Sequence, residues 1–180
     1  MNIIVIPAKG GSTRLPNKNM APLNGRPMID YSIDQALASK LTDAIYVSTD
    51  SDAIEAHARS RNLQVIRRPE SLGGDTFMIE VMRHAISTID DPNIAVLVCL
   101  QPDHPDRAIS VDESLEVFKR ENVDKVFSTE ADGTKNGAHY VLSRHYLDTD
   151  ECRTEFGVID DCTNVHYQAD LDKAAANLKK

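Results

Sequence analysis

The stretch that decides the fold is MNIIVIPAKGGSTRLPNKN, residues 1–19. The apolar run over residues 2–6 is typical of a buried strand, and a long polar loop follows it directly. That loop holds two adjacent glycines, a Ser-Thr pair and the cations Lys9, Arg14 and Lys18. A glycine-rich cationic loop directly after a strand is suited to binding an anion.

The loop is locally cationic, because no acidic residue occurs before Asp30 in a chain whose formal net charge is -8. Gly10 and Gly11 let the backbone turn with its N–H groups facing inward, and Ser12 and Thr13 add hydroxyl donors. The pattern is neither GxxxxGK[ST] nor GxGxxG. Its chemistry nevertheless predicts a phosphate-binding loop, with a plain solvated loop as the alternative.

Composition limits the class of protein. A chain of 180 residues can bury its core as a single domain, which we expect to span residues 1–180. Charged residues make up 27% of it, and no apolar run reaches the roughly 18 residues that span a bilayer. The opening residues lack the order of a signal peptide, so we expect a cytoplasmic protein. Net negative charge argues against nucleic acid or an anionic membrane as partner.

Short β-rich runs alternate with helical patterns along most of the chain. This alternation predicts an α/β fold, a Rossmann-like doubly wound, mostly parallel sheet with helices on both faces. Residues 94–100 are apolar on both faces and are expected at the centre of a parallel sheet. Strands are predicted at 2–6, 44–48, 63–66, 94–100, 125–129 and 138–143, and helices at 28–40, 51–61, 76–89, 111–120 and 170–180.

Two of these helices carry capping signals in the sequence. Ser110 and Glu113 have the spacing of a capping box, and Asp52 and Glu55 have the same spacing at the start of the helix predicted over 51–61. The three cysteines lack the paired CxxC spacing of a zinc site and are predicted to be reduced thiols.

In open α/β sheets the ligand lies beyond the carboxyl ends of the strands. The loops expected to carry function are 7–26, 48–52, 67–76, 101–109 and 129–137.

The first loop resembles the signature of the CMP-sugar-acid synthetases, the cytidylyltransferases that activate acylneuraminates and related sugar acids, and STRLP resembles the CMP-Kdo synthetases. The resemblance continues through PLNGRPMIDYSIDQA, VSTDSDAIEAHA, RRPESLGGDT, LVCLQPDHPDR and KNGAHYV, and so covers roughly residues 3–142. It implies a nucleotide-diphospho-sugar transferase-like fold and transfer of CMP from CTP to a small acceptor, with release of pyrophosphate. It also implies Mg²⁺ as cofactor, with Mn²⁺ as an alternative.

The resemblance also implies roles for individual residues. Those expected to bind the nucleotide are Ala8, Lys9, Gly10, Gly11, Ser12, Arg14, Lys18, Asn19, Arg68, Asp75 and Thr76. Those expected at the acceptor are Gln101, Asp103, His104, Arg107 and Asn136, although Asn136 is also part of an ordinary Asn-Gly turn pair. Those expected to act in catalysis are Lys9, Lys18, Gln101 and His104.

The sequence departs from the family beside the acceptor. LQPTSPLR appears as LQPDHPDR, so Asp103, His104 and Asp106 replace small hydroxyl and apolar residues. Extra carboxylates there would repel an anionic acceptor and favour one that carries an amine. His104 is either a base acting on an acceptor hydroxyl or a polar loop histidine. Larger residues at 77–79 follow the GDT motif, so cytidine is expected but not fixed.

The late segment of the family, DIDTPEDL, has to be matched to residues 164–171. In that register Asn164 and His166 stand in place of two metal-binding aspartates, with Asp170 nearby. A shifted register would use Asp170 and Asp172 instead, and a third interpretation makes this segment only the lead-in to the last helix. Asn and His are weaker ligands than carboxylates for Mg²⁺, and imidazole favours manganese or zinc.

Three functions therefore remain open from the sequence. The first is a cytidylyltransferase that acts on a sugar acid, and the second is one that acts on a phosphate or phosphonate. The third is a non-catalytic relative that binds a nucleotide without transferring it. A homodimer is possible, but the chain after residue 142 is short for the segment through which sialic acid enzymes pair.

Overall fold

The computed structural model describes residues 1–73 and 76–179. Its strands are β1 (Asn2–Pro7), β2 (Pro22–Leu23), β3 (Arg26–Pro27), β4 (Ala44–Thr49), β5 (Gln64–Arg67), β6 (Val96–Leu100), β7 (Lys125–Thr129), β8 (Lys135–Ser143) and β9 (Glu155–Ile159). Its helices are α1 (Ile29–Ala38), α2 (Asp52–Ser60), α3 (Met78–Ile89), α4 (Val111–Glu121), α5 (Arg144–Thr149) and α6 (Gln168–Asn177), with the 3-10 turns η1 (Lys18–Met20) and η2 (Glu70–Leu72).

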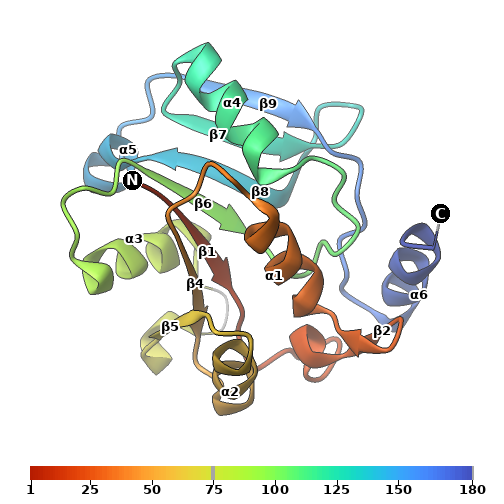
Figure 1. Ribbon diagram of the computed structural model, residues 1–180. Coiled ribbons are helices and arrows are strands. Elements are labelled where there is room, and N and C mark those ends of the chain that lie inside the picture. The colour runs from red at the N-terminus through yellow and green to blue at the C-terminus, as the bar shows by residue number, and fades with distance from the viewer. Residues whose placement is uncertain (74–75, 180) are drawn as a thin grey trace.

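Within the described residues, seven strands form one sheet in the order β5-β4-β1-β6-β8-β7-β9 (Figure 1). The pairs β4–β5, β1–β4, β1–β6 and β7–β9 are parallel, whereas β8 runs antiparallel to both β6 and β7. This arrangement confirms the predicted mostly parallel α/β fold. It also aligns the carboxyl ends of β1, β4, β5 and β6 at one edge of the sheet, where loops can converge on a ligand.

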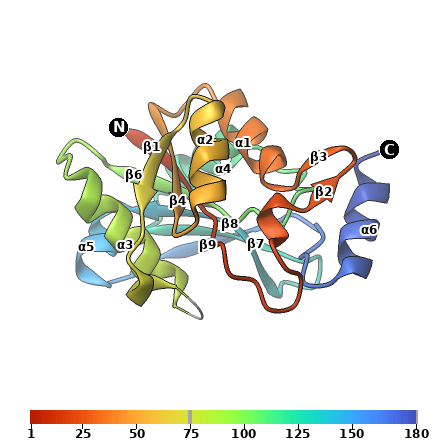
Figure 2. The ribbon, with the colours of Figure 1, turned by 90° about the horizontal axis from the view of Figure 1, so that it is seen from below.

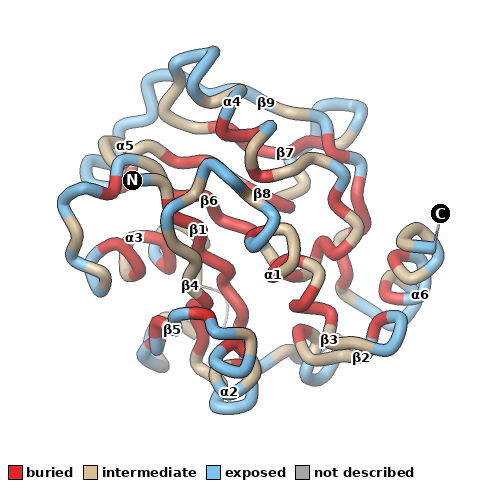
Figure 3. Tube along the Cα trace, in the orientation of Figure 1, coloured by how far each residue is buried: buried red, intermediate tan, exposed pale blue. Residues whose placement is uncertain are grey.

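Helices cover the sheet on both faces because each strand in its middle is apolar on both sides. Helices α1, α2 and α4 bury their apolar stripes on one face, against residues such as Ile4, Ile6 and Val98. Helices α3 and α5 pack on the other face, against Ile3 and Leu97. Figure 2 shows the two groups of helices on opposite sides of the sheet, and Figure 3 shows the central strands among the most buried parts of the chain.

The centre of the sheet differs from the sequence prediction in one respect. The apolar strand β6 is central, but one of its two neighbours, β8, is antiparallel. The cause is the tight turn after β7, where Gly133 has φ of +89° and the chain reverses directly into β8. Asn136 and Gly137 therefore lie within β8 and not in a turn. The start of β8 consequently lies at the same edge as the carboxyl ends of its parallel neighbours.

Helix caps confirm one prediction and correct another. Ser110 and Glu113 form the expected capping box of α4. Helix α2 is capped by Ser51, whose side chain accepts a hydrogen bond from the backbone of Ile54, so the predicted capping role of Asp52 was wrong. Ser51 is the N-cap because it lies just before the helix in extended conformation. Its hydroxyl can therefore accept from the free N–H groups of the first turn.

The C-terminal segment folds back beside the first loop. Helix α6 packs with the β2–β3 hairpin in a third apolar cluster that includes Leu23, Val165 and Leu171, and Leu15 of the first loop packs against it. Figure 1 shows α6 standing next to β2 at one side of the molecule. This packing brings His166, which precedes α6, close to the first loop. Among the helices described, none is long and apolar enough to cross a membrane.

Candidate functional site

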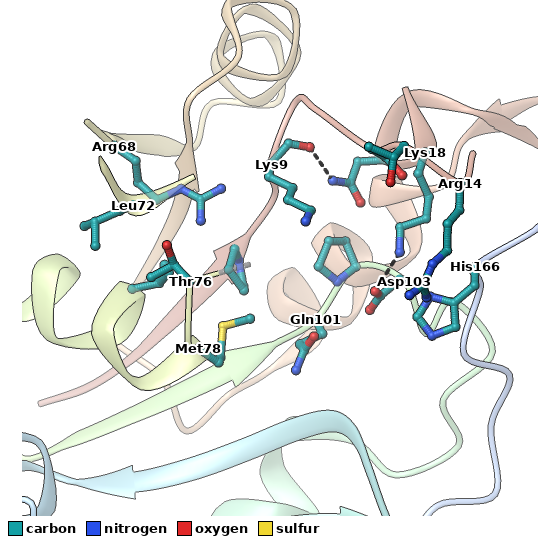
Figure 4. A pocket seen from close by; sticks show the side chains of 16 residues that line it. Lys9, Arg14, Lys18, Arg68, Leu72, Thr76, Met78, Gln101, Asp103 and His166 are labelled. Carbon is teal, nitrogen blue, oxygen red and sulfur yellow. Dashed lines mark hydrogen bonds and ion pairs between the residues drawn. The ribbon is translucent and has the colours of Figure 1, made fainter. Parts of the chain in front are cut away.

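A cavity of about 290 Å³ opens where β1, β5 and β6 end, and we call it the main pocket (Figure 4). It draws residues from the first loop, from the segment after β5, from the β6–α4 loop and from the C-terminal segment. The described residues that line it are Pro7, Lys9, Ser12, Thr13, Arg14, Lys18, Asn19, Arg68, Leu72, Thr76, Met78, Val81, Gln101, Pro102, Asp103 and His166.

The main pocket is cationic within an anionic protein. Its described lining includes Lys9, Arg14, Lys18 and Arg68 against one carboxylate, Asp103. Figure 4 shows Lys18, Arg14 and His166 on one side of the pocket, Arg68 on the other and Lys9 between them. Two unit charges about 4 Å apart attract by roughly 4 kcal/mol at an effective dielectric constant near 20. Several such contacts can hold a polyanion.

Lys18 joins three segments that are distant in the sequence. Its Nζ donates to Asp103 Oδ2 at 2.8 Å and to the backbone oxygen of Val165 at 2.9 Å. The backbone N–H of Val165 in turn donates to the backbone oxygen of Asp103. The first loop, the β6–α4 loop and the C-terminal segment are thus tied together at the edge of the pocket.

The rest of the first loop is held by its own polar contacts. Asn19 is buried and donates from Nδ2 to the backbone oxygen of Lys9 at 2.9 Å. The N–H of Gly10 donates to Asp50 Oδ1 at 2.7 Å, so this amide points away from the main pocket. A Cβ atom at Gly10 would lie 2.7 Å from Ser51 Cβ, so the close approach of Ser51 requires a glycine at this position. At Gly11 no such contact exists among the described atoms within 4 Å.

Arg68 stands on the other side of the pocket. It is only 7% exposed, yet its Nε and Nη2 have no hydrogen-bond partner among the described residues. Burial lowers the pKa of the guanidinium, and the negative charge of Asp50 partly opposes this effect. Buried guanidinium N–H groups without partners are rare in folded proteins. Among the described residues these N–H groups are therefore available to a polar ligand.

Apolar side chains lie next to Arg68. Leu72 lies beside Arg68 in Figure 4, and Met78 lies further along the same side, beyond Thr76. Val81 also lines the pocket. Leu72, Met78 and Val81 were not predicted from the sequence as pocket residues. The helical periodicity of α3 assigned Val81 to the core stripe alone, and nothing in the sequence aims Leu72 at the pocket. The combination of one guanidinium with apolar side chains suits a flat heterocycle that also carries polar edges.

Asp103 and His104 have different surroundings, although they are adjacent in the chain. Asp103 lines the pocket, whereas His104 is 2% exposed and is not among the lining residues. Burial disfavours the ionised Asp103, but the hydrogen bond from His104 and the charge of Lys18 outweigh it and hold the pKa of this carboxyl well below its usual range. Asp103 is thus an ionised acceptor at working pH and a poor proton acceptor.

Other residues expected at the acceptor form hydrogen bonds with neighbouring segments and do not line the pocket. Arg107 is buried and donates from Nη2 to Ser32 Oγ at 2.5 Å and to the backbone oxygen of Gln101 at 3.0 Å. Asn136 donates to the backbone oxygen of Asp160 at 2.7 Å. Neither residue is among those that line the main pocket, whereas Gln101 is. Arg107 and Asn136 therefore fix the loop positions and do not themselves face the cavity.

Asp106, the third residue of the altered LQPDHPDR segment, is also turned away from the pocket. Its carboxylate accepts from the backbone N–H and the hydroxyl of Thr163, both at 2.8 Å, and from Asn177 Nδ2. Of the three replaced residues, Asp103 faces the pocket, and its charge is balanced by Lys18. Among the described lining residues, the group of carboxylates expected beside the acceptor is therefore reduced to Asp103.

The expected metal ligands of the late segment do not converge. His166 lines the pocket, but Asp170 accepts hydrogen bonds from the backbone N–H groups of His166 and Tyr167 at the start of α6. Asp172 of the shifted register is exposed and bonded to Gln168. Over residues 1–73 and 76–179, no group of three or more histidine, cysteine, aspartate or glutamate side chains is arranged to hold a metal ion. Asn164 is likewise not among the lining residues.

The structure therefore brings together most of the residues expected around a nucleotide. Seven expected nucleotide ligands line the main pocket, namely Lys9, Ser12, Arg14, Lys18, Asn19, Arg68 and Thr76. Asp75 lies outside the described residues. Ala8 is buried in the continuation of β1, with its N–H on the backbone oxygen of Ser48. The three cysteines are free thiols, as predicted.

Comparison with known proteins agrees with this geometry. Residues 3–149 match the sequence profile of a family described as cytidylyltransferase. Over 122 residues the chain is 34% identical to an 8-amino-3,8-dideoxy-manno-octulosonate cytidylyltransferase of Shewanella amazonensis, covering 67% of this chain and 49% of that protein. Over 130 residues it is 35% identical to an N-acylneuraminate cytidylyltransferase of Streptococcus agalactiae, covering 70% of this chain and 31% of that protein. The matches thus span half or less of these relatives.

Solved structures share the fold. A CMP:2-keto-3-deoxy-manno-octonic acid synthetase in complex with CTP superposes with a TM-score of 0.79 at 17% identity, over 99% of this chain and 98% of that one. A Mycobacterium tuberculosis protein in complex with manganese superposes with a TM-score of 0.70 at 13% identity, over 97% of each chain. These likenesses confirm the fold.

Proposed function

The chain belongs to the cytidylyltransferase family, and on this basis we propose that it transfers CMP from CTP to an oxygen of a small acceptor and releases pyrophosphate. The acceptor class that we favour is a sugar acid. Two relatives matched by the chain are named for acceptors of this class, an amino-dideoxy-octulosonate and an acylneuraminate.

The observation that carries the proposal is the division of the main pocket into two chemically different sides. Lys18, Arg14 and Ser12 offer charge and a hydroxyl donor to phosphate oxygens. Arg68, beside the apolar Leu72, offers buried N–H groups that have no partner within residues 1–73 and 76–179. We assign the triphosphate to the first side and the base with its ribose to the second.

The chemistry is displacement at the α-phosphorus. An oxygen of the acceptor forms the new bond to phosphorus while the bond to the bridging oxygen of the β-phosphate breaks, and pyrophosphate leaves with that electron pair. Little covalent chemistry falls to the protein, so its contribution is positioning and stabilisation of charge on the phosphate oxygens. We assign the supply of this charge to Lys18 and Lys9, and contact with the acceptor to Gln101, since all three line the pocket.

A divalent metal fits this site in a limited way. Mg²⁺ is commonly bound through one or two carboxylates together with phosphates of the substrate. Asp103 supplies one ionised carboxylate at the pocket, and the nucleotide would supply the remaining oxygens. His166 also lines the pocket and would suit Mn²⁺ better than Mg²⁺. When bound, the metal would neutralise charge on the phosphates, and Asp103 would be its main protein ligand.

A second candidate is a phosphate or phosphonate acceptor. It is favoured by the lack of an evident base among the described residues of the pocket, because His104 is buried outside it and Asp103 is a poor proton acceptor. A phosphate or phosphonate oxygen is already ionised and needs no base. A sugar-acid hydroxyl, in contrast, has to lose its proton to water or to a metal-bound group during the reaction.

The test is release of pyrophosphate from CTP in the presence of sugar acids, amino sugar acids, and sugar or alditol phosphates. Each acceptor is assayed with Mg²⁺ and with Mn²⁺, and ATP, GTP and UTP replace CTP in matched reactions. We expect release that requires both CTP and one class of acceptor. Binding of CTP without release for any acceptor would contradict transfer and would support a non-catalytic nucleotide-binding protein.

A further inference from the structure

The two carboxylate oxygens of Asp103 have different partners. Oδ2 accepts from Lys18 Nζ at 2.8 Å, whereas Oδ1 lies 3.0 Å from His104 Nδ1. The Asp103 side chain is 18% exposed and lines the pocket, but the His104 side chain is 2% exposed and lies behind it. One oxygen is thus held by the buried His104, and the other by Lys18, which lines the pocket as Asp103 does.

The protonation of the imidazole follows from its partner. An ionised carboxylate only accepts hydrogen bonds, so Nδ1 of His104 has to be the donor. The other nitrogen, Nε2, is buried and has no hydrogen-bond partner among the described residues. A group acting as base on an acceptor would need an unprotonated nitrogen within reach of the cavity. His104 directs its bonded nitrogen to Asp103, and its ring does not line the main pocket.

We infer that His104 is a positioning residue that holds Asp103 through the Nδ1–Oδ1 hydrogen bond, so that Oδ2 faces the metal–nucleotide complex. The inference rests on the proposed function and assigns His104 a role other than acid–base catalysis. With a metal–nucleotide complex bound, Oδ2 of Asp103 would be a ligand of the metal, and Lys18 would supply charge to the phosphates. His104 would keep the carboxylate oriented in both states.

The size of the effect follows from general experience with metal sites. Groups that orient a ligating side chain through a hydrogen bond typically change metal affinity by about 10- to 100-fold when they are removed. A free carboxylate side chain would have to give up rotational freedom on binding, and here His104 has already fixed it. The inferred role therefore affects the binding of the metal more than the binding of the bare nucleotide.

Two substitutions of similar size and polarity separate the possibilities. In His104→Asn the amide nitrogen stands two bonds from Cβ, as Nδ1 does, and can still donate to Asp103. In His104→Gln the amide nitrogen stands one bond further out, at the distance of Nε2, and loses that geometry. Binding of Mn²⁺ is measured by electron paramagnetic resonance with a non-hydrolysable CTP analogue, and binding of the analogue alone is measured by calorimetry in EDTA.

We expect wild type and His104→Asn to bind the Mn²⁺–analogue complex alike, and His104→Gln to bind it about 10- to 100-fold more weakly. Affinity for the analogue in EDTA should stay within about twofold in all three proteins, since no phosphate contact is removed. Equal Mn²⁺ affinity in all three would overturn the inference. So would loss of turnover in His104→Asn with normal Mn²⁺ affinity, because that result identifies a base.

A measurement on the unaltered protein covers the case in which either variant fails to fold. Nitrogen NMR of histidine-labelled protein reports which ring nitrogen of His104 carries the proton. A protonated Nδ1 supports the inference, and an unprotonated Nδ1 overturns it. If wild type binds no nucleotide at all, the proposed function fails, and the inference that rests on it fails with it. Binding by wild type with no difference between the variants defeats the inference alone.

Discussion

Arg68 offers a perturbation whose effects on stability and on binding have opposite signs. Replacing it with methionine keeps much of the apolar stem and removes the guanidinium. Two buried N–H groups that have no partner among the described residues, Nε and Nη2, disappear with it. Each buried unsatisfied polar group costs about 1–3 kcal/mol, and the attraction of Asp50 for the guanidinium offsets part of that cost. We therefore expect Arg68→Met to raise the free energy of unfolding of the ligand-free protein by about 1–2 kcal/mol.

For a chain of this length, that gain corresponds to a rise in Tm of about 2–8 °C. Affinity for CTP should move in the other direction. A hydrogen bond to a charged group contributes about 1.5–3 kcal/mol, so its loss should weaken binding of CTP roughly 10- to 100-fold. The assays are thermal and urea denaturation of the ligand-free protein and calorimetric titration with CTP.

The neighbouring Arg67 provides the matched control. It is exposed and forms ion pairs with Asp52 and Glu55, away from the main pocket. Arg67→Met should leave CTP affinity unchanged and lower the free energy of unfolding by at most about 1 kcal/mol. If Arg68→Met were instead less stable than wild type and bound CTP normally, Arg68 would be a structural residue and the assignment of this side of the pocket would be refuted.

Three further results are expected. Lys18→Ala should lower the rate of CMP transfer about 10²- to 10³-fold through loss of one charge on the phosphates, and near-normal turnover would remove Lys18 from the mechanism. Burial, helped by the charge of Arg107, lowers the pKa of His139 to about 3, so below about pH 6.5 the unfolded chain binds the extra proton. The free energy of unfolding should then fall with decreasing pH by up to about 1.4 kcal/mol per unit, and urea titrations should show a shallower fall in His139→Gln. Cys152 is exposed while Cys99 and Cys162 are buried, so one thiol should react quickly with a thiol reagent, and three fast thiols would contradict the fold.

Most of the fold was predictable because its elements carry strong local patterns. The apolar run at the start of the chain became β1, and the helical stripe over 76–89 became α3. Strand β9 was not predicted, because it lies at the edge of the sheet and most of its residues are exposed, so no alternation of apolar and polar residues marks it. Helix α5 has six residues, too few for a helical period to be read.

The functional site, like the fold, could be predicted from the sequence only in part. Local chemistry predicted that the cations and hydroxyls of the first loop face a ligand, and Lys9, Ser12, Arg14 and Lys18 do line the pocket. Contacts between distant segments were not predictable. The bond from Lys18 to Val165 spans 147 residues of sequence and depends on how α6 folds back. The burial of His104 is another result of tertiary packing that the loop sequence does not reveal.

The central claim is that the first loop and the residues around Arg68 bind a nucleoside triphosphate. A crystal structure of the protein soaked with a non-hydrolysable CTP analogue and Mn²⁺ tests it most directly. The account predicts β- and γ-phosphate oxygens within hydrogen-bond distance of Lys18 and Ser12, with the base beside Arg68 and Leu72. An analogue found elsewhere, for example between α3 and α5 at Arg83 and Arg144, with Lys18 still on Asp103, would contradict it.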